Sequence, residues 1–187
     1  ECVDVQLSGD DNQNDASDAD GDYGFTVATG GNYTITPYSD NNPKAGLATS
    51  DLVFIQLHIL NVLDLNSPYK IIAADANNDQ EVSVTDLVFL QALLLNNIPE
   101  LPNNTSWRFV EEAYTFPVPQ NPWSEVFPES ISYNDVSEDK LDGDFVAIKI
   151  GDVTEDGGLT ACTGGGAFGP AGNRSETGQL VLSAEER

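Results

Sequence analysis

The sequence predicts an α+β fold in which short β-strands flank a duplicated unit, an acidic loop followed by a helix. Apolar and polar residues alternate in segments before residue 39 and after residue 99, as half-buried strands require. Between these flanks, two apolar runs of helical length, 50–60 and 85–95, each follow a loop rich in Asp and Asn. One constant offset of 35 residues relates the two units, which indicates an internal repeat.

The second loop, DANNDQEVSVTD at 75–86, has polar residues at the offsets of an oxygen-ligand calcium loop. Ca²⁺ takes about six to eight oxygen ligands, and only a tightly curled loop lets alternate side chains point inward. An ordinary solvated turn with a helix N-cap explains single residues of this kind, but it does not explain the whole pattern. The predicted ligands are the side chains of Asp75, Asn77, Asp79, Ser83 and Asp86, and the backbone carbonyl of Glu81.

The first loop, 40–51, repeats this design in a weaker form. Lys44 stands at the fifth position and Ala48 at the ninth, so the loop lacks two oxygen ligands and gains a cation. Water or a neighbouring segment would have to supply the missing oxygens, and the sequence leaves calcium binding there open. The remaining candidate ligands are Asp40, Asn42, Asp51 and the backbone carbonyl of Gly46.

The duplicated loops and helices, from residue 38 to about residue 99, resemble a type I dockerin. The resemblance implies two calcium-loop-helix units that pack antiparallel around a shared apolar core. It also implies a cohesin-like partner, which dockerins contact through the tenth and eleventh loop positions, here Thr49 and Ser50. The basic residues that usually follow on the recognition helix are replaced by Gln56, Leu57, Gln91 and Ala92.

The segments before the repeat predict strands. Val3, Val5 and Leu7 alternate with polar residues and predict one strand. The segment 22–38 alternates around the turn residues 29–32 and predicts a β-hairpin. The polar stretch 10–22 between them predicts a loop; Asp18, Asp20 and Asp22 within it fit either a cation site or a tight turn.

The segments after the repeat also predict strands. Aromatic residues mark two short strands, at 107–109 and at 114–116. The run 145–150 predicts a buried strand with Val146, Ile148 and Ile150 on one face. Because so few strands make no stable core alone, we expect strands from both flanks to complete one β-sandwich, with the helical pair packed against it or inserted in it.

The segments VDVQLSG, DADGDYGFTV and GNYTITP resemble strands of a prealbumin-like or SdrD B-like sandwich, and the order of the whole chain is similar to a module of secreted and surface proteins of Bacteroidota. These resemblances imply an Ig-like or prealbumin-like β-sandwich combined with a dockerin-like pair, and an extracellular or cell-surface setting of an adhesin or scaffold. The implied organisation is sandwich strands at 1–38, the dockerin-like unit at 39–99, completing strands at 100–155, and a Gly-rich linker with a C-terminal strand at 156–187.

The composition of the chain limits the classes of molecule that it can bind. With 31 Asp and Glu against 7 Lys and Arg, the formal net charge of −24 repels nucleic acid and anionic membranes and favours bound cations. No run of about 18 apolar residues predicts a membrane span. Cys2 and Cys162, without a CxxC motif, predict either a disulfide that joins the ends of the fold or an intermolecular pair, and both favour an extracellular location.

No enzyme activity is expected, because His58 is the only histidine and no GxSxG or phosphate-loop motif is present. The main hypothesis is an extracellular, calcium-stabilised structural or adhesive building block, a filament subunit that contacts copies of itself or an adjacent β domain by head-to-tail β-strand addition. The alternative is a dockerin-type module that docks a cohesin-like protein. For strand addition, the predicted partner-binding residues are Gln179, Leu180, Val181, Leu182 and Ser183.

Overall fold

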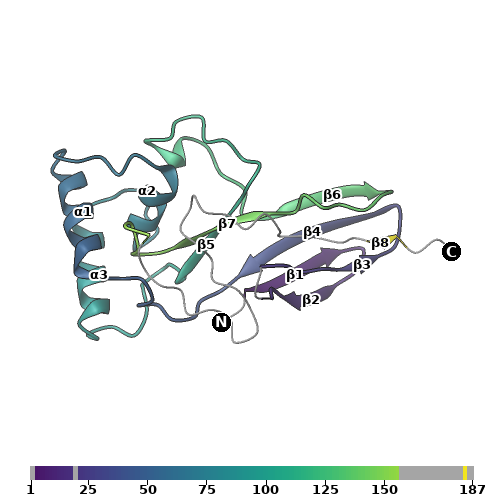
Figure 1. Cartoon of the computed structure of the whole chain (residues 1–187), viewed down its shortest axis with the longest axis horizontal. Helices are drawn as coiled ribbons and strands as arrows, with labels where there is room; N and C mark the ends of the chain where they lie inside the picture. Colours follow the sequence, from purple (N-terminus) through teal and green to yellow (C-terminus); the bar gives the residue numbers. More distant parts are fainter. Residues whose placement is uncertain (1–2, 19–20, 156–182, 185–187) are drawn as a thin grey trace.

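The fold is α+β, as the sequence predicts, in a computed structural model that describes residues 3–18, 21–155 and 183–184. The helices gather at one end of the molecule, and the longer strands extend from the other (Figure 1). The strands are β1 (Asp4–Gly9), β2 (Gln13–Ala16), β3 (Thr26–Val27), β4 (Gly31–Tyr38), β5 (Trp107–Glu111), β6 (Ile131–Val136), β7 (Phe145–Lys149) and β8 (Ser183–Ala184). The helices are α1 (Thr49–Ile59), α2 (Pro68–Ala74) and α3 (Val84–Leu94), with a short 3-10 helix, η1 (Pro122–Ser124).

The largest sheet is antiparallel, in the order β2-β1-β4-β6. Val3, Val5 and Leu7 are all buried, which confirms the predicted first strand and its inner face. Strand β4 precedes the helices and β6 follows them, so their pairing joins the two flanks of the chain in one sheet. The finer expectation of an Ig-like or prealbumin-like sandwich stays a prediction.

The predicted hairpin at 22–38 is wrong. Strand β4 pairs with β1 and β6, whereas β3 pairs in parallel with β8. The core that β1 and β4 help to form also buries Tyr23, Phe25 and Val27. The segment that contains β3 therefore packs into this core and adds no strand to the largest sheet. Alternation correctly indicates which side chains are buried, but it carries no information about the strand to which a segment is hydrogen-bonded.

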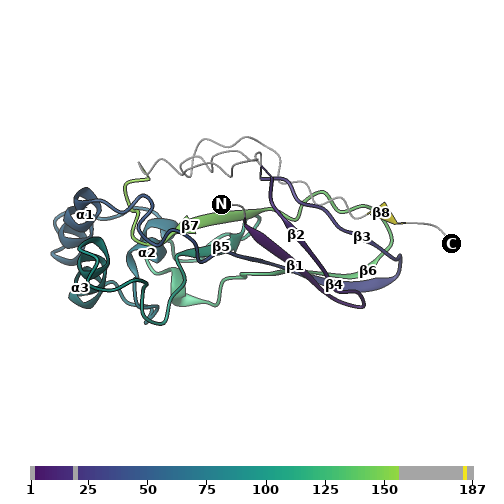
Figure 2. The ribbon, with the colours of Figure 1, turned by 90° about the horizontal axis from the view of Figure 1, so that it is seen from below.

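The predicted loop at 10–22 contains a strand. Strand β2 pairs with β1 at the edge of the largest sheet (Figure 2). Its residues are exposed or half-buried. An edge strand of this kind packs no apolar side chains, so its sequence shows no alternation. The charge of Asp15 on this edge strand also discourages pairing with other chains.

Strands β5 and β7 form a separate antiparallel ribbon that lies between two hydrophobic cores. Val110 and Ile148 face the core of the helical end, and Phe109 packs into the core of the largest sheet. The predicted face of Val146, Ile148 and Ile150 is therefore confirmed, because all three belong to or pack against the helical core. The ribbon makes the helices and the strands parts of one framework.

The second strand predicted after the helices, at 114–116, is wrong. The segment is irregular, and Phe116 is buried against the rings of Tyr69 and Phe127, with centroids 5.6 and 5.7 Å away. Aromatic side chains can pack into a core from a loop as well as from a strand. The two aromatic residues at 114 and 116 were therefore not sufficient evidence for a strand.

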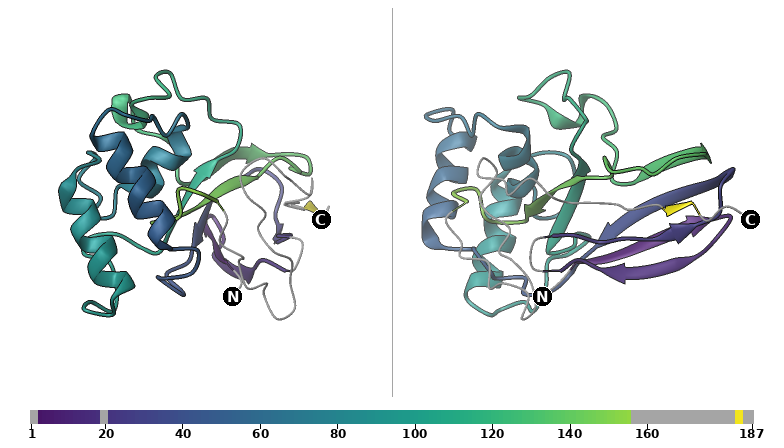
Figure 3. Two further views of the ribbon diagram at one scale, coloured as in Figure 1. Left: turned by 60° about the vertical axis from the view of Figure 1, so that its left-hand side comes forward. Right: turned by 45° about the vertical axis from the view of Figure 1, so that its right-hand side comes forward.

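Helices α1 and α3 have the same length, begin 35 residues apart and contact each other (Figure 3). Each begins at the tenth loop position, one residue before the predicted start. Ile55 and Leu90, at equivalent positions, are fully buried in the helical core. The repeat in the sequence is therefore a repeat in the structure.

Helix α2 was not predicted. It begins with Pro68 in its first turn, where the missing N–H has no intrahelical partner to lose, and its last four residues are buried. At seven residues it is too short for a clear helical period. Within the described residues, no helix is long and apolar enough to cross a membrane.

Candidate metal site

The second loop gathers three carboxylates. One oxygen each from Asp75, Asp79 and Asp86 lies within 4.8 Å of the others, so this triad can hold a metal ion. Asp75 is the C-cap of α2 and Asp86 lies in the first turn of α3. Both are buried, while Asp79, between them, is exposed. Two helix ends therefore fix the outer carboxylates of the triad, and the loop carries the middle one.

Hydrogen bonds to the outer carboxylates curl the loop. The Asp75 carboxylate accepts from the N–H groups of Asp79 at 3.1 Å and Gln80 at 2.9 Å. The Asp86 Oδ1 accepts from the N–H of Ala76 at 2.8 Å. Gln80 stands where Gly is favoured, and it adopts the required left-handed φ of 69°. The sharp turn therefore forms without glycine.

The other predicted ligands of this loop lie around the triad. The Asn77 Nδ2 donates to Asp79 Oδ2 at 2.8 Å, and the N–H of Glu81 donates to Asp79 Oδ1 at 3.1 Å. The Ser83 Oγ donates to Asp86 Oδ2 at 3.2 Å and also accepts from the N–H of Thr85, as an N-cap does. The side chains of Asn77 and Ser83 therefore contact the triad, and calcium binding by them and by the Glu81 carbonyl stays a prediction.

Electrostatics within the triad favour a cation. Burial, together with the negative charges of Asp86 and Asp79, raises the pKa of Asp75 from its ordinary value of 3.8 to about 6, although the hydrogen bonds from Gln80 and Asp79 act in the opposite direction. A bound cation would offset both effects. The available donors are carboxylate, amide, hydroxyl and carbonyl oxygens, a set that suits a hard cation such as Ca²⁺.

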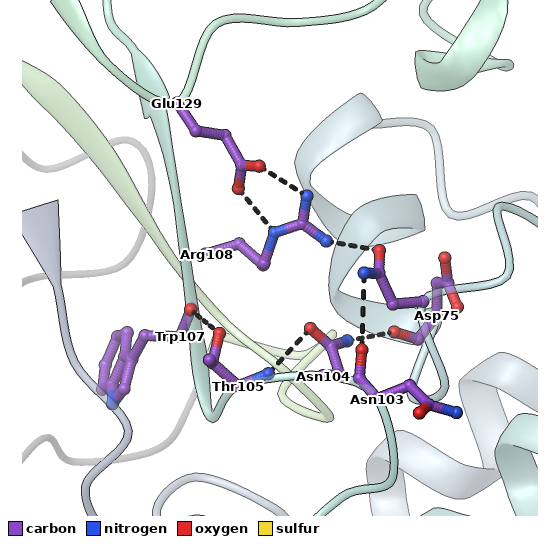
Figure 4. Close-up of polar contacts among 8 residues, drawn as sticks. Asp75, Asn103, Asn104, Thr105, Trp107, Arg108 and Glu129 are labelled. Carbon is purple, nitrogen blue, oxygen red and sulfur yellow. Dashed lines mark hydrogen bonds and ion pairs between the residues drawn. The ribbon is translucent and has the colours of Figure 1, made fainter. Parts of the chain in front are cut away.

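A network of polar contacts ties the second loop to the ribbon (Figure 4). The Asn104 Nδ2 donates to the carbonyl oxygen of Asp75 at 2.8 Å. Arg108, in β5, donates to Asn78 Oδ1 at 2.6 Å and forms a two-pronged ion pair with Glu129, at 2.5 and 2.8 Å. We call Asn78, Asn104, Arg108 and Glu129 the loop–strand network.

Sequence reasoning did not single out the loop–strand network. Asn104, Arg108 and Glu129 are distant in sequence from the loop, and polar residues before a strand are common. One signal was available: Arg108 is one of only 7 basic residues in a chain of formal charge −24, and it lies in a predicted strand. A rare cation in such a position indicates a specific acidic partner.

The first loop arranges its carboxylates differently. The Asp40 Oδ1 accepts from the N–H and the Oγ of Ser106, at 2.7 and 2.8 Å. The Asp51 Oδ1 accepts from the N–H groups of Val153 and Thr154, at 3.0 and 2.9 Å. Asp51 still accepts from the first loop through its other oxygen, since Oδ2 accepts from the N–H of Ala48 at 2.8 Å. Asn42 and Gly46, the other candidate ligands, take left-handed φ values of 50° and 72°.

The predicted partner-binding residues are described only in part. In the first turn of α1, Thr49 is exposed and Ser50 is half-buried. The backbone of Ser183 pairs with that of Thr26. Four of the predicted strand-addition residues and both cysteines lie outside the described residues: Gln179, Leu180, Val181, Leu182, Cys2 and Cys162.

The described fold and site define an α+β protein with an acidic triad held between two helix ends and attached to a β-ribbon. Comparisons of the chain with known protein families, curated proteins and solved structures found no match. The function is therefore inferred from the residues of the site and their surroundings.

Proposed function

We propose that the chain is an extracellular structural or adhesive building block that calcium stabilises. The observation that carries the proposal is the acidic triad of Asp75, Asp79 and Asp86 at the junction of α2 and α3. A cation bound there would stabilise the charged form of carboxylates, which burial and mutual repulsion disfavour. The oxygen donors and the high acidity of the chain favour Ca²⁺.

A structural role suits this metal better than a sensing role. Ala74 and Ala76, on either side of Asp75, are fully buried, so the loop is built into the helical core. The loop–strand network connects the same loop to β5. Binding would therefore stabilise the packing of helices on strands, since a ligand that binds only the folded state stabilises it by mass action.

The proposed assembly is head-to-tail β-strand addition. Strand β8, from the C-terminal end of the chain, pairs in parallel with β3. This pairing supports the idea that the edge of β3 accepts a strand from the C-terminal segment. In an assembly, the accepted strand would come from the next copy, and such contacts propagate into a filament unless they close a ring.

Electron microscopy and sizing of the purified chain test the assembly. We expect polymers from the native sequence, and their loss when Leu180→Asp and Leu182→Asp place charges in the predicted strand. Ser175→Asp with Thr177→Asp is the matched control, because it adds the same charge before that strand. A native chain that stays monomeric, or a control that also fails to polymerise, would contradict strand addition.

A second candidate function is a dockerin-type module that docks a cohesin-like partner. It is favoured by exposed apolar residues at equivalent positions of the two helices. Val53 and Val88 are 48% and 57% exposed, and Leu60 and Leu95 are 60% and 61% exposed. Such a duplicated apolar surface is typical of an interaction face. If Val53→Asp abolishes binding to a cohesin while polymers remain absent, this candidate replaces the first.

A further inference from the structure

We propose that the first loop, 40–51, is held by an internal cation, the ammonium group of Lys149, and takes no metal ion. Lys149 is the last residue of β7 and is only 6% exposed. Its Nζ donates to the carbonyl oxygen of Pro43, inside the loop, at 2.8 Å, and to that of Ile150 at 2.9 Å. A protein ammonium thus reaches backbone oxygen of the loop.

Two carboxylates balance the charge of this ammonium. Burial lowers the pKa of Lys149 to about 8, while the negative charges of Asp152 and Asp40 oppose that shift, so the ammonium is charged at neutral pH. Asp152 is buried and approaches the loop closely: a Cβ atom built on Gly46 would lie 2.4 Å from Asp152 Oδ2. The Trp107 ring, 5.9 Å from Nζ, covers the ammonium further.

The two loops show why one needs a metal and the other does not. At the twelfth position of the second loop, Asp86 Oδ1 accepts from the loop's own Ala76. At the twelfth position of the first loop, Asp51 Oδ1 accepts instead from Val153, just after β7. The segment that carries Lys149 and Asp152 therefore supplies to the first loop both a cation and the hydrogen-bond donors that occupy its last carboxylate.

The other lysine of the region does not supply this cation. Lys44 replaces the fifth ligand of the loop, but its Nζ donates to Asn96 Oδ1, beyond the end of α3, and it is exposed. A calcium ion placed between Asp40 and Asp51 would meet the Lys149 ammonium beside Pro43 and would be repelled by it. Lys44 is consequently the matched control for Lys149.

Counting bound calcium tests the inference in the folded native chain. Equilibrium dialysis against calcium should give one ion per chain, lost in Asp79→Ala and retained in Asp40→Asn. Two ions per chain, with one lost in Asp40→Asn, would overturn the proposal. These variants keep Lys149, so the number of bound calcium ions tests the proposal even if a Lys149 variant fails to fold.

Thermal unfolding gives the second readout. Lys149→Gln should lower the Tm by at least about 6 °C relative to Lys44→Gln, because it leaves the buried carboxylate of Asp152 without its cation. The loss should be equal with calcium and with chelator. Equal Tm values for the two variants would overturn the proposal. A native chain that binds no calcium would contradict the proposed function of the second loop, but the comparison of lysine variants would still decide this inference.

Discussion

The side-chain amide of Asn104 donates a 2.8 Å hydrogen bond to the backbone carbonyl of Asp75, the first residue of the second loop. The amide is oriented by its own oxygen, which accepts from the N–H of Thr105 at 3.0 Å. Asn104 precedes β5, so one side chain connects the acidic triad to the ribbon that separates the two cores. The state of the loop and the packing of the strands are therefore coupled through this contact.

Asn104→Asp should destabilise the calcium-loaded protein by about 1–3 kcal/mol. The substitution removes the donor to Asp75 and puts a negative charge beside a carbonyl oxygen and an acidic loop. Asn103→Asp is the control, because the Asn103 side chain is exposed and adds the same charge one residue away. Denaturant unfolding measures both variants, and equal losses would argue against a special role for Asn104.

Removing calcium should lower the Tm of the native chain. At a calcium concentration of about 100 times Kd, binding contributes about 2.7 kcal/mol, which corresponds to a Tm shift of about 5–11 °C for a chain of this size. Differential scanning calorimetry with calcium and with chelator measures the shift. Magnesium should restore less of it, because it dehydrates reluctantly and demands stricter geometry.

Two neighbouring variants identify the ligands. Asp79→Asn should abolish the calcium-dependent Tm shift, because Asp79 supplies the middle carboxylate of the triad. Glu81→Gln removes the same charge from the same loop but leaves its backbone carbonyl in place, and it should keep most of the shift. If both variants lose the shift equally, general acidity and not the predicted ligand set attracts the metal.

The pKa of Asp75 predicts different pH dependences of stability with and without metal. In metal-free protein the folded-state pKa is about 6, against 3.8 ordinarily. Between these values the folded state binds a proton that the unfolded state has lost, so this carboxyl makes the free energy of unfolding rise as pH falls from 6 to 4. Calcium needs the charged carboxylate, so its stabilising effect should shrink below about pH 6.

Tm measurements with calcium and with chelator between pH 5 and pH 8 check this dependence. The gap between the two curves should narrow at the acidic end, because the metal-free protein gains stability there, whereas a carboxylate that the metal keeps charged gives the metal-bound protein no matching gain. In Asp75→Asn the carboxyl is absent, and the metal-free curve should lose this contribution. A gap that is as wide at pH 5 as at pH 7 would contradict the role given to Asp75.

The sequence predicted the features that depend on local spacing. The triad forms because Asp75, Asp79 and Asp86 stand at the offsets at which one curled loop turns its side chains inward. The two helices and the buried faces of β1 and β7 follow from apolar periodicity. In each case the determining residues lie within about a dozen positions of one another.

The sequence did not predict features that depend on contacts between distant segments. Asp51 and Thr154 are 103 residues apart, and no local pattern indicates that one accepts from the other. The same holds for Lys149 and Pro43, and for the pairing of β3 with β8. Long-range pairing is decided by which surfaces the whole fold brings together, so a single sequence gives only indirect signals such as a rare cation in a strand.

Arg108→Lys should weaken the coupling between the second loop and the ribbon. Arg108 makes a two-pronged pair with Glu129, donates to Asn78 and lies 5.6 Å from the Phe127 ring centroid. Lysine keeps the charge but not the planar fork, so we expect a loss of about 1–2 kcal/mol in the free energy of unfolding. Lys140→Ala, which breaks the exposed pair with Glu138, should have no measurable effect.

Hydrogen exchange separates a coupling role of Arg108 from a merely local one. If the loop–strand network transmits the effect of the metal, calcium should protect amides of β5 and β7 in the native chain. In Arg108→Lys that protection should shrink in the strands while the second loop itself still responds to calcium, because the triad is intact. Strand amides that respond equally in both proteins would mean that calcium acts on the ribbon through the packed core around α2. That route exists because the Ala73 carbonyl, in α2, accepts from the N–H of Gly151, just beyond β7, at 2.8 Å.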